Sequence, residues 1–299
     1  MKKKATPPKD DLEVIAPRLD GDITSEDWQD VLNGQTWEEY TQVIADKYAA
    51  HPHYDRNDMF RPHFNRMAPL GNRTASDVEA FYRSDIWCRL LAFECPKEGL
   101  LRSIINQYTS EASLAEAPLA GFLQAYDAHL KRHEDGETLR PFRVLDHGCG
   151  RGEFTLSALW LRPAISVVCC DFRTPARELL QRAIAKYMPW ADVTFCWVGE
   201  NDYETLGPYD YINSSEVLEH VWNPVEEAVR LCRSAKDGST MHLSTFFNDC
   251  EGKNPSHLRE HHKYQDTALW FGVLSQIGWE ICGNDPRGIP KLFRKTTTT

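Results

Sequence analysis

From residue 142 onward, short apolar runs alternate with segments whose apolar residues recur at the spacing of a helix. The runs predict strands at FRVLDH (142–147), ISVVCCDF (165–172), DVTFCWV (192–198), YDYINS (209–214) and TMHLSTF (240–246). The periodic segments predict helices over 153–162, 174–188, 223–235 and 264–278. Strands that alternate with helices form parallel crossovers and a sheet covered on both faces. We therefore predict an α/β, doubly wound, mostly parallel sheet, to which the C-terminal runs WEICG and KLFRK add an antiparallel strand.

The first 140 residues follow a different pattern. Residues 1–24 are polar and contain prolines, so we expect a flexible N-terminal segment. Several segments after it have helical spacing, including one that follows a capping box at Ser76 and Glu79 and another at 118–133. We therefore expect residues 25–140 to form a mainly helical cap that selects the substrate, and residues 141–299 to form the α/β domain.

Composition and charge narrow the class of protein. The chain of 299 residues has a net charge of −10, and counting the sequence places −7 of it in the first 140 residues. Neither part has the basic surface that binds a long nucleic-acid backbone, so a duplex partner is disfavoured, whereas a short or terminal nucleic-acid substrate stays open. No run approaches the roughly 20 apolar residues of a membrane span. The nine cysteines include no CxxC pair, and we expect reduced thiols in a cytoplasmic protein.

The clearest motif is a glycine loop directly after the first predicted strand. Asp146 is followed by Gly148, Gly150 and Gly152 at alternate positions. Residues without side chains let a ligand approach the backbone at the carboxyl end of a parallel sheet. The second strand ends at Asp171, where a carboxylate can accept hydrogen bonds from ribose hydroxyls. The GxGxG spacing and the preceding acid disfavour a pyrophosphate and favour a cationic or amine-bearing nucleoside.

These residues resemble the class I S-adenosylmethionine-dependent methyltransferases over about residues 142–295, which implies a Rossmann-like fold and S-adenosylmethionine as cofactor. The resemblance implies that Asp146 and the glycine loop hold the methionine part. It also implies that Asp171 holds the ribose and that Phe172 packs on the adenine. An acid near the adenine amino group is expected from residues 198–202, where Glu200 is favoured and Asn201 and Asp202 are the alternatives.

A second motif, SSEVLEHVWNP (214–224), follows the fourth strand. It is similar to a segment of the ubiquinone-biosynthesis O-methyltransferases, the nearest in motif, and of the small-RNA 3′-terminal 2′-O-methyltransferases. The resemblance adds Ser215 to the cofactor-binding residues. If 216–220 is a helical turn, Glu216, Glu219 and His220 lie on one face and could bind Mg²⁺. His262, or alternatively His261, would be the fourth ligand.

Other roles for this segment need no metal. In that interpretation Glu216 contacts the cofactor, Glu219 caps a helix, and His220 is either an isolated base or a hydrogen-bonded structural residue. Transfer to an oxygen requires removal of a proton, and the candidate catalytic bases are His220 and His262, whose imidazoles titrate near neutrality.

Three functions remain open at this stage. The leading hypothesis is methyl transfer to a small-molecule acceptor, at oxygen. The first alternative is a metal-assisted RNA 2′-O-methyltransferase, although its ligands are usually farther apart in sequence than they are here. The second alternative is a non-catalytic protein that binds S-adenosylmethionine. Methylation of a DNA base amine is disfavoured, because SSEV stands where a [DNS]PP[YF] segment is expected.

Overall fold

The computed structural model describes residues 117–134, 140–150, 152–173, 177, 180–181, 184–185, 188–245, 247, 259–284 and 290–296. The predicted N-terminal segment, the capping box and most of the predicted cap lie outside the described residues.

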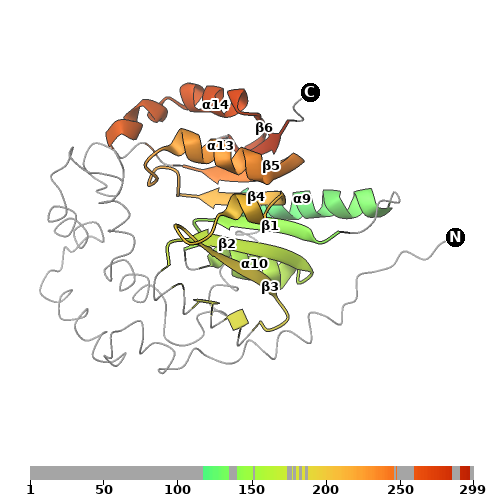
Figure 1. Cartoon of the computed structure of the whole chain (residues 1–299). Helices are drawn as coiled ribbons and strands as arrows, with labels where there is room; N and C mark the ends of the chain where they lie inside the picture. The colour runs from blue at the N-terminus through green and yellow to red at the C-terminus, as the bar shows by residue number, and fades with distance from the viewer. Residues whose placement is uncertain are drawn as a thin grey trace, which may run out of the picture.

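Seven strands in the described part form one sheet in the order β3-β2-β1-β4-β5-β7-β6 (Figure 1). Their bounds are β1 Phe142–His147, β2 Ile165–Asp171, β3 Asp192–Trp197, β4 Tyr209–Ser215, β5 Ala235–Ser244, β6 Trp279–Asn284 and β7 Pro290–Lys295. The first five are paired in parallel, and β7 is antiparallel to β5 and to β6. The predicted mostly parallel α/β sheet with an antiparallel C-terminal strand is therefore confirmed.

β5 begins five residues earlier than the predicted 240. Tyr209 is paired with Ala235 and Tyr211 with Thr240, so the intervening residues of β5 form an irregularity in the ladder. Lys236 in this stretch makes an ion pair with Asp210, at 2.6 Å between Nζ and Oδ2. The polar Lys-Asp-Gly sequence interrupts the apolar pattern here, which is why the sequence pattern located only the later part of the strand.

The described helices are α9 (Ala117–Glu134), α10 (Glu153–Leu161), α12 (Tyr203–Leu206), α13 (Pro224–Ser234) and α14 (Thr267–Gln276), with a 3-10 helix η3 (Arg259–Gln265). None of these helices is long and apolar enough to cross a membrane. α12 was not predicted, because one turn is too short to show a period. Its capping residue is Asp202, whose side chain accepts a hydrogen bond from the Glu204 amide at 3.0 Å.

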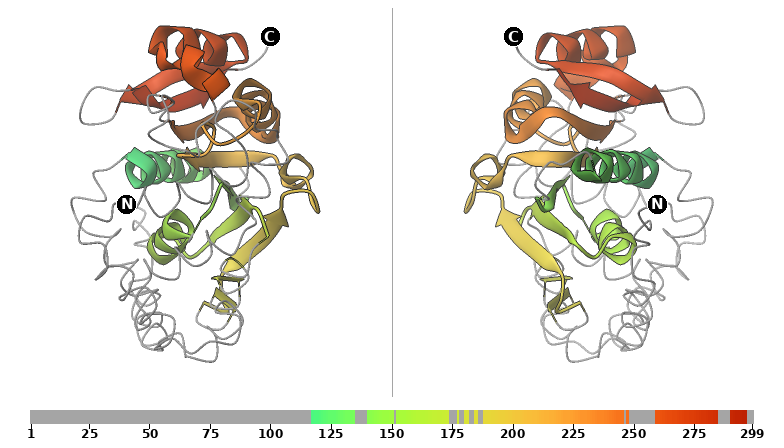
Figure 2. Two further views of the ribbon diagram at one scale, coloured as in Figure 1. Left: turned by 90° about the vertical axis from the view of Figure 1, so that its left-hand side faces the viewer. Right: turned by 90° about the vertical axis from the view of Figure 1, so that its right-hand side faces the viewer.

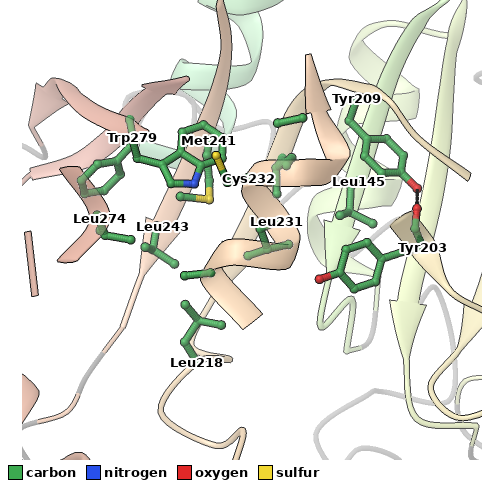
Figure 3. Close-up of a cluster of buried hydrophobic side chains, with 14 of the residues drawn as sticks. Leu145, Tyr203, Tyr209, Leu218, Leu231, Cys232, Met241, Leu243, Leu274 and Trp279 are labelled. Atoms are coloured by element: carbon green, nitrogen blue, oxygen red, sulfur yellow. Dashed lines mark hydrogen bonds between the residues drawn. The ribbon is translucent and has the colours of Figure 1, made fainter. Parts of the chain in front are cut away.

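Successive residues of the central strands supply two separate cores, one on each face of the sheet. Val144 of β1 joins a cluster with residues of α9 and α10, and the next residue, Leu145, joins a cluster with residues of α13 and α14. Figure 2 shows α9 and α10 on one side of the sheet and α13 on the other. The second cluster, including Leu145, Leu231 and Leu274, is drawn in Figure 3. These cores fix the strand ends that carry the polar residues described below.

α9 packs directly on the sheet, although its residues lie within the range expected to form the cap. The Tyr211 hydroxyl of β4 donates a hydrogen bond to the Pro118 carbonyl at 2.7 Å. A Cβ at Gly121 would lie 2.4 Å from Leu292 Cδ2 of β7, so glycine allows this close approach. α9 therefore belongs to the layer that supports β4 and β7.

Candidate functional site

The glycine loop connects β1 to α10 at the carboxyl end of the sheet. Gly148, Gly150 and Gly152 all have positive φ, of 68°, 54° and 79°. The Gly148 and Cys149 amides donate to the Cys170 carbonyl of β2 at 2.8 and 3.1 Å. Residues with a side chain rarely adopt a positive φ, whereas glycine does so readily. The three glycines therefore stand at the positions where the loop needs this conformation.

The loop also touches the segment after β4. A Cβ at Gly148 would lie 2.2 Å from Val217 Cγ2, whereas among the described residues a Cβ at Gly150 would meet only the Gly148 carbonyl, at 3.9 Å. Gly148 is therefore needed for packing inside the protein. The described residues leave open space beside the backbone of Gly150, which is what a ligand lying on the loop requires.

Asp146 lies beneath the loop and is 1% exposed. Its Oδ2 accepts a hydrogen bond from the Thr155 hydroxyl of α10 at 2.7 Å, and its Oδ1 accepts one from the Asn213 amide of β4 at 2.9 Å. Burial raises the pKa of Asp146, while these two hydrogen bonds act in the opposite direction. The carboxylate therefore joins β1, α10 and β4 within the protein.

The hydrogen bonds continue from Asn213 to β5. The Asn213 carbonyl oxygen accepts from the Ser215 hydroxyl at 3.0 Å and lies 3.1 Å from Nδ1 of His242. Burial, together with the charge of Lys291, lowers the pKa of His242 to about 3, so its imidazole is neutral near pH 7. Because the Asn213 oxygen can only accept, we assign the single ring proton of His242 to Nδ1. Ser215, a predicted cofactor residue, thus lies at the end of a chain of hydrogen bonds.

A second polar network lies on the opposite face of the sheet. His147 is 6% exposed, and its Nδ1 and Nε2 lie 3.0 Å from Ser214 Oγ and from Glu227 Oε1 of α13. Glu227 also accepts hydrogen bonds from the Tyr203 hydroxyl at 2.6 Å and from Arg230 at 2.9 Å. The network ties the residue before Gly148 to α12 and α13.

Glu227 is ionised despite its burial. Burial alone would raise its pKa, but hydrogen bonds and charges from His147, Tyr203 and Arg230 outweigh that effect and lower the pKa to about 2. Burial and the neighbouring carboxylate raise the pKa of Tyr203 well above its usual value, so its hydroxyl remains a donor. The contact between His147 and Glu227 therefore holds the start of the glycine loop against α13.

Asp171 ends β2 beside the glycine loop, as predicted. Its Oδ2 accepts one hydrogen bond, from the Gly150 amide at 2.8 Å. The same oxygen makes an ion pair with Nε of Arg177 at 2.9 Å. Its Oδ1 accepts from the Phe172 amide at 2.7 Å. The structure thus brings Asp171, Gly150 and the backbone of Phe172 together, and it adds Arg177, which the sequence analysis did not identify.

The three candidates for the acid near the adenine have different surroundings. Glu200 is exposed on the turn after β3 and makes an ion pair with Arg173, two residues beyond Asp171, at 3.2 Å. Asp202 caps α12 and makes an ion pair with Arg230 at 2.9 Å. Asp202 therefore has a structural role at the start of α12, and Asn201 is exposed beside Glu200. The choice of Glu200 among the three stays a prediction.

The expected helical turn at 216–220 is not observed. Glu216 has φ of +55°, and the turn is confined to 218–220. The Glu216 amide donates to the Ser244 carbonyl at 2.8 Å, and its Oε1 accepts from the Ser244 hydroxyl at 2.6 Å. Pairing with the end of β5 therefore holds Glu216 out of a helix. Glu216 is exposed whereas Glu219 is fully buried, so the two do not share a face.

Two of the four predicted metal ligands, Glu216 and Glu219, therefore do not converge as expected. The described residues contain no group of three or more His, Cys, Asp or Glu side chains that could hold a metal ion. His220 is half-buried at the end of the turn. His262 lies in η3, and its side chain is outside the description.

The alternative to His262, His261, has a structural position. It is 2% exposed, and its Nδ1 and Nε2 lie 3.2 and 3.3 Å from the carbonyl oxygens of Glu219 and Trp222. His261 therefore supports the turn that carries His220, which gives η3 a part in shaping the site.

Several of these residues were not found from the sequence. Arg177, Glu227 and His242 carry no local motif, because their partners lie on other elements. His147 had a usable signal: it follows Asp146 in a strand, so alternation places the two side chains on opposite faces. A network on each face of the sheet was therefore foreseeable, although its members were not.

The contact between Gly148 and Val217 leads to a stability prediction. Gly148→Ala introduces a Cβ at positive φ and forces it against Val217, so we expect a loss about 2 kcal/mol larger than that of Gly238→Ala. Gly238 is the matched control, because its φ is 74° and no atom of the described part of the chain lies within 4 Å of an added Cβ. Urea unfolding of both variants measures the difference, and equal losses would contradict the packing argument.

The low pKa of Glu227 leads to a prediction about acid stability. The carboxyl ionises near 4.5 when unprotected and near 2 in the folded protein, so its ionised form stabilises the fold above about pH 4.5. That contribution is lost as the pH falls from 4.5 toward 2. We expect Glu227→Gln to lose about 2 kcal/mol at pH 7 and to show a flatter acid dependence over this window.

The measurement is chemical denaturation at several pH values. Glu226→Gln is the control, because it removes the same charge from the same first turn of α13 at an exposed position. If both variants lose the same free energy of unfolding, the network does not stabilise the ionised form of Glu227.

Comparison with solved structures finds similar folds at low identity. An O-methyltransferase family protein from Burkholderia thailandensis is 13% identical, with TM-score 0.48, over 87% of this chain and 71% of that one. Human N-acetylserotonin methyltransferase is 15% identical, with TM-score 0.46, over 84% and 69%. EvdMO1 is 21% identical, with TM-score 0.38, over 57% of this chain, which spans only 41% of EvdMO1. At these values the similarities carry no argument about activity or substrate.

The family comparison is decisive. No curated protein matches the sequence. A family model described as a methyltransferase domain matches residues 82–277, about two thirds of the chain. The match includes the glycine loop, Asp171 and the segment after β4. The chain therefore belongs to the methyltransferase-domain family.

Proposed function

We propose that this protein transfers a methyl group from S-adenosylmethionine to an oxygen of a small-molecule acceptor. The observation that carries the proposal is the contact between the Gly150 amide and Asp171, at 2.8 Å. It joins a loop with open space beside its backbone to a carboxylate at the end of the next strand. This is the arrangement that a nucleoside with free ribose hydroxyls requires.

The residues around this contact fit the cofactor. In the proposal Gly148, Gly150 and Gly152 shape the loop that holds the methionine part, and Asp171 accepts a hydrogen bond from the ribose. Phe172 packs on the adenine, and Glu200 faces its amino group. Asp146 has both oxygens engaged inside the protein. We therefore assign it the role of positioning the loop, and Ser215 the role of lining the site through its bond to Asn213.

The remaining chemistry is proton removal and alignment. When bound, S-adenosylmethionine supplies a methyl group that is already activated by a neutral leaving group. The protein must hold the acceptor oxygen in line and remove its proton. We propose His220 as the base, because it is half-buried on the turn that follows β4 and is supported by His261. His262 in the neighbouring η3 is the alternative base.

The class of acceptor follows from charge and from the site. The net charge of −10 disfavours a long nucleic-acid backbone as partner, and we propose a small molecule rather than a short RNA end as the acceptor. The described residues bring no three metal ligands together, so no step of the proposal passes through Mg²⁺. In this proposal the residues of the expected cap that precede α9, 25–116, select the acceptor, because α9 packs on the sheet.

Calorimetric titration with S-adenosylhomocysteine tests the cofactor site without knowledge of the acceptor. We expect micromolar binding, about −8 kcal/mol, which Asp171→Ala weakens at least about 30-fold because a charged acceptor of hydrogen bonds is lost. Asp237→Ala is the control, since its exposed carboxylate pairs with Lys295 at the start of β5. Absence of binding to the unaltered protein, or equal binding to Asp171→Ala, would overturn the proposal.

A further inference from the structure

Glu216 has an unusual backbone conformation at the carboxyl end of β4. Among the residues that the structure describes, it is the only one other than glycine with positive φ, at +55°. Such a conformation is unfavourable for a residue with a side chain and persists only where neighbouring groups enforce it, which occurs most often at functional sites. Here the Glu216 amide donates to the Ser244 carbonyl of β5 at 2.8 Å. The side chain of Glu216 is therefore a candidate for contact with a ligand.

The carboxylate of Glu216 is held at one oxygen and open at the other. Its Oε1 accepts a hydrogen bond from the Ser244 hydroxyl at 2.6 Å, and that hydroxyl accepts one from Nζ of Lys291 in β7 at 3.1 Å. Because the ammonium of Lys291 can only donate, the single proton of Ser244 is directed to Glu216. Glu216 is exposed, and its Oε2 has no hydrogen-bond partner in the described part of the chain. Glu216 therefore presents an oriented oxygen to a ligand.

Glu216 lies beside the start of the glycine loop. Ser214, two residues before it, is paired with His147 of β1. A Cβ added at Gly148 would lie 2.2 Å from Cγ2 of Val217, the residue after Glu216. In the proposed function this loop holds the amino-acid part of the cofactor, which carries an α-ammonium and an α-carboxylate. A carboxylate next to the loop is in the position to pair with that ammonium.

Asp146, the acid that the sequence assigns to the methionine part, is not available to an ammonium. It is 1% exposed, and both of its oxygens accept hydrogen bonds from within the protein. We propose that Glu216 binds the α-ammonium of the cofactor, and that Ser244 and Lys291 are positioning residues that act through it. This inference rests on the proposed function, since it assumes that the amino-acid part lies along the glycine loop. An anchored ammonium fixes where the nearby sulfur lies and where its methyl group is presented.

The test compares S-adenosylhomocysteine with its analogue in which hydrogen replaces the α-amino group, by calorimetry. We expect the analogue to bind the unaltered protein at least about 10-fold more weakly, because a hydrogen bond between two charged groups is lost. Equal binding of the two ligands would overturn the proposal. Failure of S-adenosylhomocysteine itself to bind would instead refute the proposed function.

The variant Glu216→Gly assigns the effect to the carboxylate. Glycine adopts positive φ readily, so we expect this variant to fold with the same turn after β4. It should bind S-adenosylhomocysteine at least about 10-fold more weakly than the unaltered protein does, and the deaminated analogue to within about 3-fold. Losses of the same size for both ligands would mean that Glu216 only shapes the loop, and they would overturn the proposal.

The variant Ser244→Ala tests the positioning role. It keeps the carboxylate of Glu216 but removes the donor to Oε1, so we expect the ratio of the two affinities to fall by about 3-fold. A loss of stability alone does not change this ratio, and an unchanged ratio would overturn the role of Ser244. Glu226→Gln is the control, because it removes an exposed carboxylate from α13 and should leave the binding of both ligands unaltered.

Discussion

The hydrogen bonds to the buried carboxylate of Asp146 are the interaction on which the site depends. A carboxylate that is 1% exposed must be satisfied inside the protein, and Thr155 and Asn213 do this from α10 and β4. Both partners must therefore lie within hydrogen-bond distance of Asp146, near the end of β1. That requirement fixes where the glycine loop begins and how β4 meets it.

Because side chains alternate along a strand, the start of the glycine loop is held from both faces of the sheet. Asp146 and His147 are neighbours, so their side chains lie on opposite faces of the sheet, one bonded to α10 and β4 and the other to Glu227 of α13. The glycine loop is thus held from both faces just before Gly148. A loop fixed in this way presents its open backbone beside Asp171 without needing a ligand to shape it, which is the benefit of a preorganised site.

The sequence predicted the features that arise from local pattern. Strand periodicity predicted the sheet. The glycines and the acid at the end of the second strand predicted a loop and a carboxylate at one edge of the sheet, and the structure joins them through the bond between the Gly150 amide and Asp171. Contacts between distant elements left no such signal: Arg177 on Asp171 and Glu227 on His147 depend on how helices pack. The prediction of a helical turn at 216–220 was wrong for the same reason. The spacing of residues could not show that pairing with Ser244 of β5 holds Glu216 at positive φ.

The most direct measurement is a crystal structure of the complex with S-adenosylhomocysteine. The account predicts the ribose beside Asp171 and the amino-acid part along Gly148 to Gly152. A ligand bound away from the glycine loop, or a ribose that makes no contact with Asp171, would contradict it.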